Sequence, residues 1–363
     1  MYDCARLPKD KKLLIDINSA AGRLFDKLRD LDVNALSISD YNKRYFGEKL
    51  VSLVIDLQAY SYLLAWSLFK SEYKSSKFVF LEYGGGTGML SLLAKELGMG
   101  NVIYNDIYDV SCHDSKCIAK SIENEADYYI PGDIDDVLVF LRKENINCNA
   151  VASCDVIEHI YDIKSFFRKI PLLSDSALNV VMSSAANIFN PSIRKAYMAA
   201  AVEVEHKDRE KIWGHKERDC LKSYLKVRSE MVCEYLQELD EKLSEVEIAQ
   251  LAKNTRGMIK PDILKCVDDY LNTGKYPPEL KHPTNTCDPY TGNWAEHLMD
   301  PYNLSNILSE TGFEAEVLNG YRGCTNNGIA GRFINACKNK YISIFPKRGI
   351  RLSPFYTIYG RRD

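Results

Sequence analysis

The chain has 363 residues, 46% of them hydrophobic, which is enough for a full-sized core with appended pieces. Its 47 Lys and Arg residues face 50 Asp and Glu residues, and a net charge of −3 does not favour a nucleic-acid partner. Eleven scattered cysteines argue against a zinc knuckle and predict reduced thiols in a cytoplasmic protein. There is no signal-peptide pattern, and the most apolar run, residues 50–69, is interrupted by Asp56 and Gln58. We therefore expect no membrane partner.

Residues 1–75 are predicted to form an N-terminal helical cap. Apolar residues recur at helical spacing from Leu13 to Leu28, and a second helix is predicted from Tyr45 to Lys70. The aromatic residues of the second helix are expected to pack in the core; they are Tyr60, Tyr62, Trp66 and Phe69.

Residues 76–190 alternate between predicted strands and helices, with helices after the first, second and fourth strands and shorter connections elsewhere. Such alternation predicts a parallel, doubly wound sheet. The strands are expected at 78–83, 101–106, 127–131, 149–154 and 177–184.

Residues 191–285 contain no convincing strand and predict a helical insertion that acts as a lid, with its charge runs on a solvated face. Residues 286–363 begin with a polar, turn-rich loop that could bind a substrate. A helix, a strand, a second helix over 328–345 and a final strand over 355–360 complete the core.

The stretch 78–98 reads as a buried strand, a glycine loop and a helix. Gly84, Gly86 and Gly88 allow a sharp turn and the close approach of a ligand to the backbone. The helix that follows offers free N–H groups to an anionic or nucleotide-like ligand.

The spacing of the glycines restricts the ligand. No Lys follows in the way that a triphosphate loop requires, and Met89 or Ser91 stands where a dinucleotide loop has its third glycine. Glu82-x-Gly84-x-Gly86-x-Gly88 instead resembles motif I of the class I S-adenosylmethionine-dependent methyltransferases.

Three further segments are similar to this family. The run NVIYND ends in Asp106, Gly132-Asp133 follows the third strand, and NAVASCDVIEHI at 149–160 resembles the fourth strand and its turn. The last segment is nearest to the branch of the ubiquinone-biosynthesis O-methyltransferases, although Asn149 replaces the usual Asp. The resemblance covers roughly residues 77–190 and 300–361.

The resemblance implies a Rossmann-like seven-stranded α/β sheet whose last strand is antiparallel. It implies S-adenosyl-L-methionine as cofactor and S-adenosyl-L-homocysteine as product. Asp106 is expected on the ribose, Glu82 on the ammonium group, and Asp133 with Ile134 near the adenine, although a capping role for Asp133 is equally compatible. The expected cofactor-binding set is Glu82, Gly84, Gly85, Gly86, Gly88, Asp106, Asp133, Ile134 and Asp155.

A methyl acceptor also needs a base if its atom carries a proton. His159, directly after the fourth strand, is the first candidate, with a structural role in the turn as the alternative. His215 and His297 are weaker candidates. Trp213 and Trp294 beside them could line an acceptor pocket or pack the lid.

Glu158, His159 and a lid residue could in principle hold a divalent metal. Adjacent side chains diverge on a helix, so no metal site is predicted.

The first hypothesis is therefore methyl transfer to the oxygen of a small-molecule or sugar-type acceptor. The alternatives are transfer to nitrogen or carbon, modification of RNA or protein through a basic strip over 194–228, and a non-catalytic binding module. The oligomeric state stays open.

Overall fold

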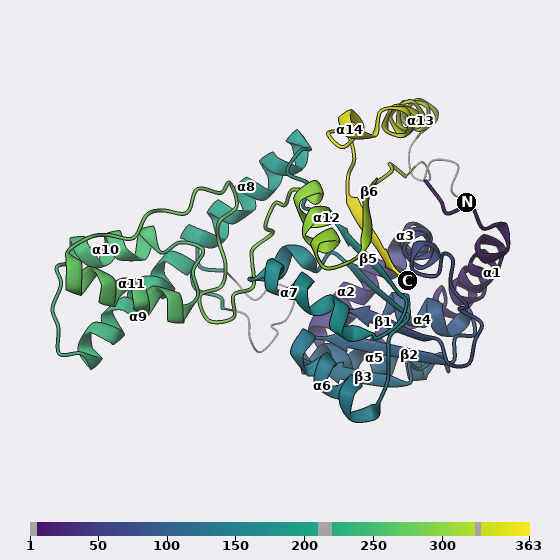
Figure 1. Cartoon of the computed structure of the whole chain (residues 1–363), viewed down its shortest axis with the longest axis horizontal. Coiled ribbons are helices and arrows are strands. Elements are labelled where there is room, and N and C mark those ends of the chain that lie inside the picture. The colour runs from purple at the N-terminus through teal and green to yellow at the C-terminus, as the bar shows by residue number, and fades with distance from the viewer. Residues whose placement is uncertain (1–5, 210–219, 324–327) are drawn as a thin grey trace. The chain divides into compact units, whose positions relative to one another are not determined.

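The computed structural model describes residues 6–209, 220–323 and 328–363 (Figure 1). The chain divides into two compact units. Unit 1 comprises Met1–Ile157, Ile163–Asn190 and Asp300–Asp363, and unit 2 comprises Glu158–Asp162 and Pro191–Met299. The predicted cap and core thus form a single unit. Residues 286–299, predicted to belong with the C-terminal part, lie in the unit of the helical insertion.

Unit 1 is built on a seven-stranded sheet in the order β3-β2-β1-β4-β5-β7-β6, in which β7 pairs antiparallel with both β5 and β6. This confirms the predicted Rossmann-like fold. The central strand β1 is buried along its whole length, as expected for an apolar strand with a neighbour on each side. The strands are β1 (Val79–Tyr83), β2 (Asn101–Asp106), β3 (Tyr128–Pro131), β4 (Ala150–Cys154), β5 (Leu178–Ser184), β6 (Glu314–Asn319) and β7 (Tyr356–Arg362).

The N-terminal helices share the main core of unit 1 with the sheet and with the helix that follows β1. Buried residues of these helices, including Leu13, Tyr62 and Trp66, belong to the same cluster as Phe80 and Leu93. The core role predicted for the aromatic residues is thus confirmed for Tyr62 and Trp66. The helices are α1 (Lys11–Leu28), α2 (Asp40–Val51), α3 (Leu53–Ser67) and α4 (Met89–Glu96).

The prediction of one helix from Tyr45 to Lys70 is wrong, because the chain bends by 91° between α2 and α3. Ser52 leaves the helical conformation at the bend, and its hydroxyl pairs with the Asp56 carboxylate and with the carbonyl oxygen of Glu48. Such local side-chain bonds compete with helix continuation. Among the described helices, none alone is long and apolar enough to cross a membrane, and only this bent pair passes that test together.

A helix also follows the third strand, where only a short connection was predicted. Asp133 and Asp136 form a reciprocal capping box at its start, and this pattern is a strong helix signal that the sequence interpretation overlooked. The remaining helices of unit 1 are α5 (Asp109–Ser121), α6 (Ile134–Glu144), α7 (Ile163–Lys169), α12 (Pro301–Glu310), α13 (Ile329–Ile344) and α14 (Pro346–Gly349), with short 3₁₀ turns at Val33–Ala35 and Ile170–Leu173. A third 3₁₀ turn, Ile157–His159, begins in unit 1 and ends in unit 2.

Unit 2 is helical, as predicted for the insertion, and its described residues form four helices. A small apolar core joins three of them through residues such as Met231, Leu251 and Ile263. The fully buried Arg228 pairs with Glu205 and donates from Nε to the carbonyl oxygen of Ala252 at 2.8 Å. The helices are α8 (Pro191–His206), α9 (Tyr224–Glu238), α10 (Glu245–Asn254) and α11 (Lys260–Thr273).

Candidate functional site

The glycine loop lies between β1 and α4, at the carboxyl end of the central strand. Gly84, Gly86 and Gly88 have φ angles of +70°, +55° and +78°, which side chains rarely adopt. A Cβ atom at Gly84, Gly85 or Gly88 would collide with a neighbouring side chain, so the protein's own packing needs these glycines.

Gly86 differs from the other loop glycines, because among the described residues a Cβ atom there would meet only the ring of Tyr45, at 3.7 Å. The protein thus leaves open space on the side of Gly86 where a side chain would project, and the backbone is accessible from that side. This is the position at which a ligand can approach the main chain.

Glu82 anchors the loop to the helix behind it. Its carboxylate oxygens accept hydrogen bonds from the backbone N–H groups of Leu90 at 3.1 Å and Ser91 at 2.8 Å. These bonds satisfy two of the helix-terminal N–H groups that were expected to be free for a ligand. Burial raises the pKa of Glu82 to about 7. Its predicted contact with a ligand ammonium group stays a prediction.

Asp106 connects the tip of β2 to the open glycine. One carboxylate oxygen accepts from the Gly86 N–H at 2.9 Å and the other accepts from the Tyr108 N–H at 3.0 Å. The Tyr104 hydroxyl donates to the Gly86 carbonyl oxygen at 2.6 Å. The structure thus brings together two of the predicted cofactor-binding residues, Gly86 and Asp106.

Asp133 is exposed and caps α6, accepting from the N–H groups of Asp135 at 2.8 Å and Asp136 at 3.4 Å. Asp133 therefore has the capping role that is the alternative to cofactor binding. The preceding Gly132 donates its N–H to the carbonyl oxygen of Asp106 at 2.9 Å, and the side chain of Ile134 is buried. A contact of this segment with adenine stays a prediction.

Asp155 follows β4 on the other side of β1. It is exposed, has a φ angle of +53°, and accepts from the Ala185 N–H at 2.8 Å, which ties the ends of β4 and β5 together. Such a strained backbone in a non-glycine residue is common at functional sites.

A cluster on the N-terminal helices was missed by the sequence interpretation. Lys49 on α2 lies 3.3 Å from the Asp56 carboxylate on α3. Its ammonium group also lies 5.5 Å from the ring centroid of Tyr45 and 5.6 Å from that of Tyr60. The i, i+4 spacing of Tyr45 and Lys49 indicates that their side chains are neighbours on a helix. The contact of Lys49 with Asp56 was not predicted, because the sequence interpretation placed both residues on one unbroken helix.

Electrostatics link this cluster to the carboxyl edge of the sheet. Burial opposes the charge on Lys49, but Tyr45 and Asp56 outweigh it and raise the pKa of Lys49. Burial raises the pKa of Tyr45, and the negative charge near the end of β4, including that of Asp155, adds to the effect. Tyr45 therefore borders the glycine loop at Gly86, and Lys49 lies beside Tyr45.

His159 lies in unit 2, where its Nδ1 is 2.8 Å from the carbonyl oxygen of Trp294. Trp294 stacks on Tyr161 with ring centroids 5.5 Å apart, and its other neighbour is His297 at 4.3 Å. Trp294 is 9% exposed and its indole N–H donates to the carbonyl oxygen of Tyr161 at 3.3 Å. Within unit 2, Trp294 thus packs in an aromatic stack.

His297 is also held in this stack, against His282 at 4.1 Å, and its Nδ1 lies 3.2 Å from the Thr284 carbonyl oxygen. Burial, and next the neighbouring His282, lower the pKa of His297 to about 4. A base with that pKa holds a proton poorly at neutral pH, which weakens the candidacy of His297. Trp213 and His215 lie outside the described residues.

Glu158, His159 and Glu296 form a group that could hold a cation, with one ligand atom of each within 4.8 Å of the others. No metal site was predicted, because adjacent side chains diverge on a helix; in the turn Ile157–His159, however, ligand atoms of Glu158 and His159 do approach each other and Glu296. The contact of His159 Nδ1 with a carbonyl oxygen favours a proton on Nδ1, which leaves Nε2 as the atom that can take a proton or bind a metal.

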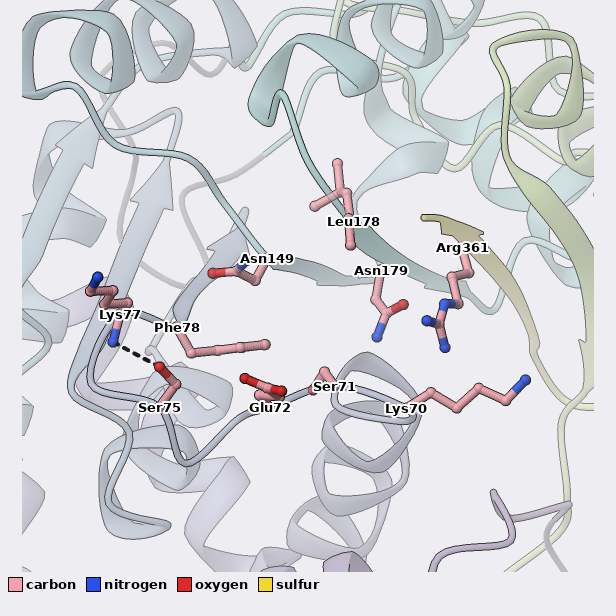
Figure 2. A pocket seen from close by; sticks show the side chains of 11 residues that line it. Lys70, Ser71, Glu72, Ser75, Lys77, Phe78, Asn149, Leu178, Asn179 and Arg361 are labelled. Atoms are coloured by element: carbon pink, nitrogen blue, oxygen red, sulfur yellow. Dashed lines mark hydrogen bonds between the residues drawn. The ribbon is translucent and has the colours of Figure 1, made fainter.

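A cavity of about 270 Å³ lies at the opposite, amino-terminal edge of the sheet (Figure 2). Its polar residues join structural elements: Asn149 accepts from the Val79 N–H at 2.9 Å, and Asn179 donates to the carbonyl oxygens of Ser67 and Phe69 at 2.9 Å. Ligands of open α/β sheets bind at the carboxyl ends of the strands, so we place the candidate site at the glycine loop.

A scan of protein-family models gives no match. A search of curated proteins gives no match either.

Solved structures do match the chain. An S-adenosylmethionine-dependent methyltransferase from Mesorhizobium loti is 14% identical, with 79% of this chain and 91% of that chain covered and a TM-score of 0.31. The plantazolicin methyltransferase BpumL in complex with SAH is 10% identical, with 96% and 99% covered and a TM-score of 0.37. For a hypothetical protein of Thermus thermphillus the identity is 12% and the TM-score 0.26, with 29% of this chain and only 61% of that chain covered. Likeness at this level does not carry a function to this chain.

Proposed function

We propose that the chain is an S-adenosylmethionine-dependent methyltransferase. The observation that supports this function is the junction of Gly86 and Asp106 at the carboxyl edge of the sheet. In the strand order, β1 lies between β2 and β4, so this edge is the switch point at which open α/β sheets bind their ligands. An accessible backbone and a carboxylate meet there.

The residues at this junction suit the cofactor. The accessible face of Gly86 can lie against a flat or extended ligand, and the second lone pairs of the Asp106 oxygens can accept from ribose hydroxyl groups. Asp155 at the end of β4 and the segment Asp133–Ile134 are proposed as the flanking contacts. Glu82 is proposed to act chiefly by fixing the loop, since both of its oxygens bind α4.

When bound, S-adenosylmethionine supplies a methyl group on a sulfonium, which is already a good leaving group. The chain's residues then have to orient the acceptor and exclude water. Tyr45, which borders the loop, and Lys49 beside it are proposed to help with both tasks. Transfer to an oxygen of a small-molecule or sugar-type acceptor is the leading proposal. The alternatives are transfer to nitrogen or carbon and modification of a macromolecule.

His159 is proposed as the base that takes the proton of the acceptor, through Nε2. Its place five residues after the end of β4 along the chain supports this role, and the contact of Nδ1 with the Trp294 carbonyl oxygen keeps the ring in one orientation. A second candidate role for the same residue is to bind a divalent cation with Glu158 and Glu296, which the grouping of their ligand atoms favours.

Gly86→Val tests the proposal. The branched side chain would occupy the accessible face of the loop, so we expect calorimetric titration with S-adenosylhomocysteine to show no binding. Gly98→Val is the matched control, because Gly98 also has a positive φ angle, +90°, and open space around its Cβ position. Both variants carry the same kind of backbone strain, but only Gly86→Val should lose the ligand. Wild-type affinity in Gly86→Val would refute the loop assignment.

A further inference from the structure

Helix α13 lies between β6 and β7 in unit 1 (Figure 1), and one of its sides is exposed and largely apolar. Ile329 is 90% exposed, Phe333 71% and Ile344 56%. At 100° per residue, the exposed apolar residues of α13 and its C-cap fall within an arc of roughly 160° on one side of the helix, and Lys340 lies near one end of this arc. The exposed members of this face are Ile329, Phe333, Ile334, Tyr341, Ile344 and Phe345.

The opposite side of α13 holds the helix on the protein. Asn339 is buried and makes two hydrogen bonds with the backbone of Arg322, at 2.8 and 2.9 Å, and Ile342 packs at Gly349 of α14. The apolar face is therefore turned to solvent while the polar Asn339 is turned inward. This inverts the usual arrangement of a surface helix, whose apolar face covers the core.

The segment around α13 is strongly basic although the whole chain is slightly acidic. From residue 317 to residue 362 there is no Asp or Glu, while nine Lys and Arg residues occur. Three of them lie on α13 and three more follow within seven residues of it; these six are Arg332, Lys338, Lys340, Lys347, Arg348 and Arg351. The exposed apolar face thus belongs to a stretch of sequence that carries positive charge and no acidic residue.

We propose that α13 docks unit 1 on an anionic lipid bilayer surface, with its apolar face in the boundary between headgroups and acyl chains. Aromatic and aliphatic residues on one face, flanked by Lys and Arg, are the pattern of interfacial helices. Anionic headgroups complement the positive charge of the segment. A second copy of the chain would bring two basic segments together, and a nucleic acid would leave the apolar residues exposed to water. The proposal revises the expectation of no membrane partner.

Co-sedimentation of the full chain with vesicles tests the proposal. We expect binding to vesicles of phosphatidylcholine with about one third phosphatidylserine, weaker binding to pure phosphatidylcholine, and release by high salt because the charges are screened. The variant Phe333→Ser/Ile344→Ser should bind at least tenfold more weakly. Its control, Ile15→Ser, removes an isoleucine that is 64% exposed on α1 and should bind like wild type.

A charge-reversal variant separates the electrostatic contribution. Lys338→Glu/Lys340→Glu should lose the preference for anionic vesicles, whereas Lys207→Glu/Lys265→Glu, which alters exposed lysines of unit 2, should keep it. Absence of binding by the wild-type chain, or equal binding by Phe333→Ser/Ile344→Ser, would overturn the proposal. So would a dimer or an oligonucleotide complex that depends on Phe333 and forms without lipid. The methyltransferase proposal is independent of these results.

Discussion

Two buried carboxylates shape the candidate site at the scale of single residues. Asp106 and Glu82 are 6% and 4% exposed, and each binds two backbone N–H groups. Asp106 holds the accessible glycine of the loop, whereas Glu82 holds the helix behind the loop. Both acids could be identified from their spacing in the sequence. The sequence did not show that Asp106 accepts a hydrogen bond from Gly86 and that Glu82 accepts its hydrogen bonds from α4.

His297 gives a prediction of pH dependence. Its pKa is about 4 in the folded protein, below the reference of 6.5, so the unfolded chain binds more protons between these values. The contribution of His297 to stability is therefore lost as the pH falls below 6.5. From this residue alone, we expect the free energy of unfolding to be about 2 kcal/mol lower at pH 5 than at pH 7.

Urea titrations at both pH values check this expectation in wild type and in His297→Gln, where the contribution should vanish. His113→Gln serves as the control, because the His113 side chain is 68% exposed. An unchanged pH dependence in His297→Gln would show that the aromatic stack does not keep this imidazole neutral.

At the scale of elements, the regular strands were predictable and the bends were not. The five expected parallel strands match β1 to β5 within one or two residues, because long apolar runs of β-favouring residues leave few alternatives. The break at Ser52 depends on contacts of one hydroxyl group with Glu48 and Asp56, which no periodicity reveals. The cluster of Tyr45, Lys49, Asp56 and Tyr60 arises from that break and was missed for the same reason.

The turn Ile157–His159 gives a prediction at the same scale. If His159 acts as a base, His159→Ala should lower methyl transfer by about a hundredfold or more while leaving affinity for S-adenosylhomocysteine unchanged. Glu296→Gln and a chelator should then have little effect on turnover. The measurement is transfer of label from methyl-tritiated S-adenosylmethionine to a metabolite extract.

The opposite result assigns the cation-binding role to this group of residues. Loss of turnover in Glu296→Gln and with chelator, restored by Mn²⁺ in the wild-type chain, would contradict the base and favour a metal held by Glu158, His159 and Glu296. Glu279→Gln is a control, because Glu279 is an exposed carboxylate of unit 2 paired with Lys253.

At the scale of the whole molecule, the chain combines a sheet with a ligand loop and a helical unit inserted after β5. From the sequence, a helical insertion is predicted over 191–285, because the alternating pattern ends at Asn190. The sequence did not predict that residues 286–299 belong to the inserted unit, since a polar loop has no periodicity that ties it to either neighbour. Nor did it reveal the exposed face of α13, because apolar spacing on a helix normally indicates a buried side.

The most direct test of the central claim is calorimetric titration of the whole wild-type chain with S-adenosylhomocysteine, and with NAD⁺ and ATP for comparison. We expect one S-adenosylhomocysteine to bind per chain and neither nucleotide to bind, because the loop lacks the third glycine of a dinucleotide site and the lysine of a triphosphate site. Binding of NAD⁺ or ATP at the loop without binding of S-adenosylhomocysteine would contradict the account.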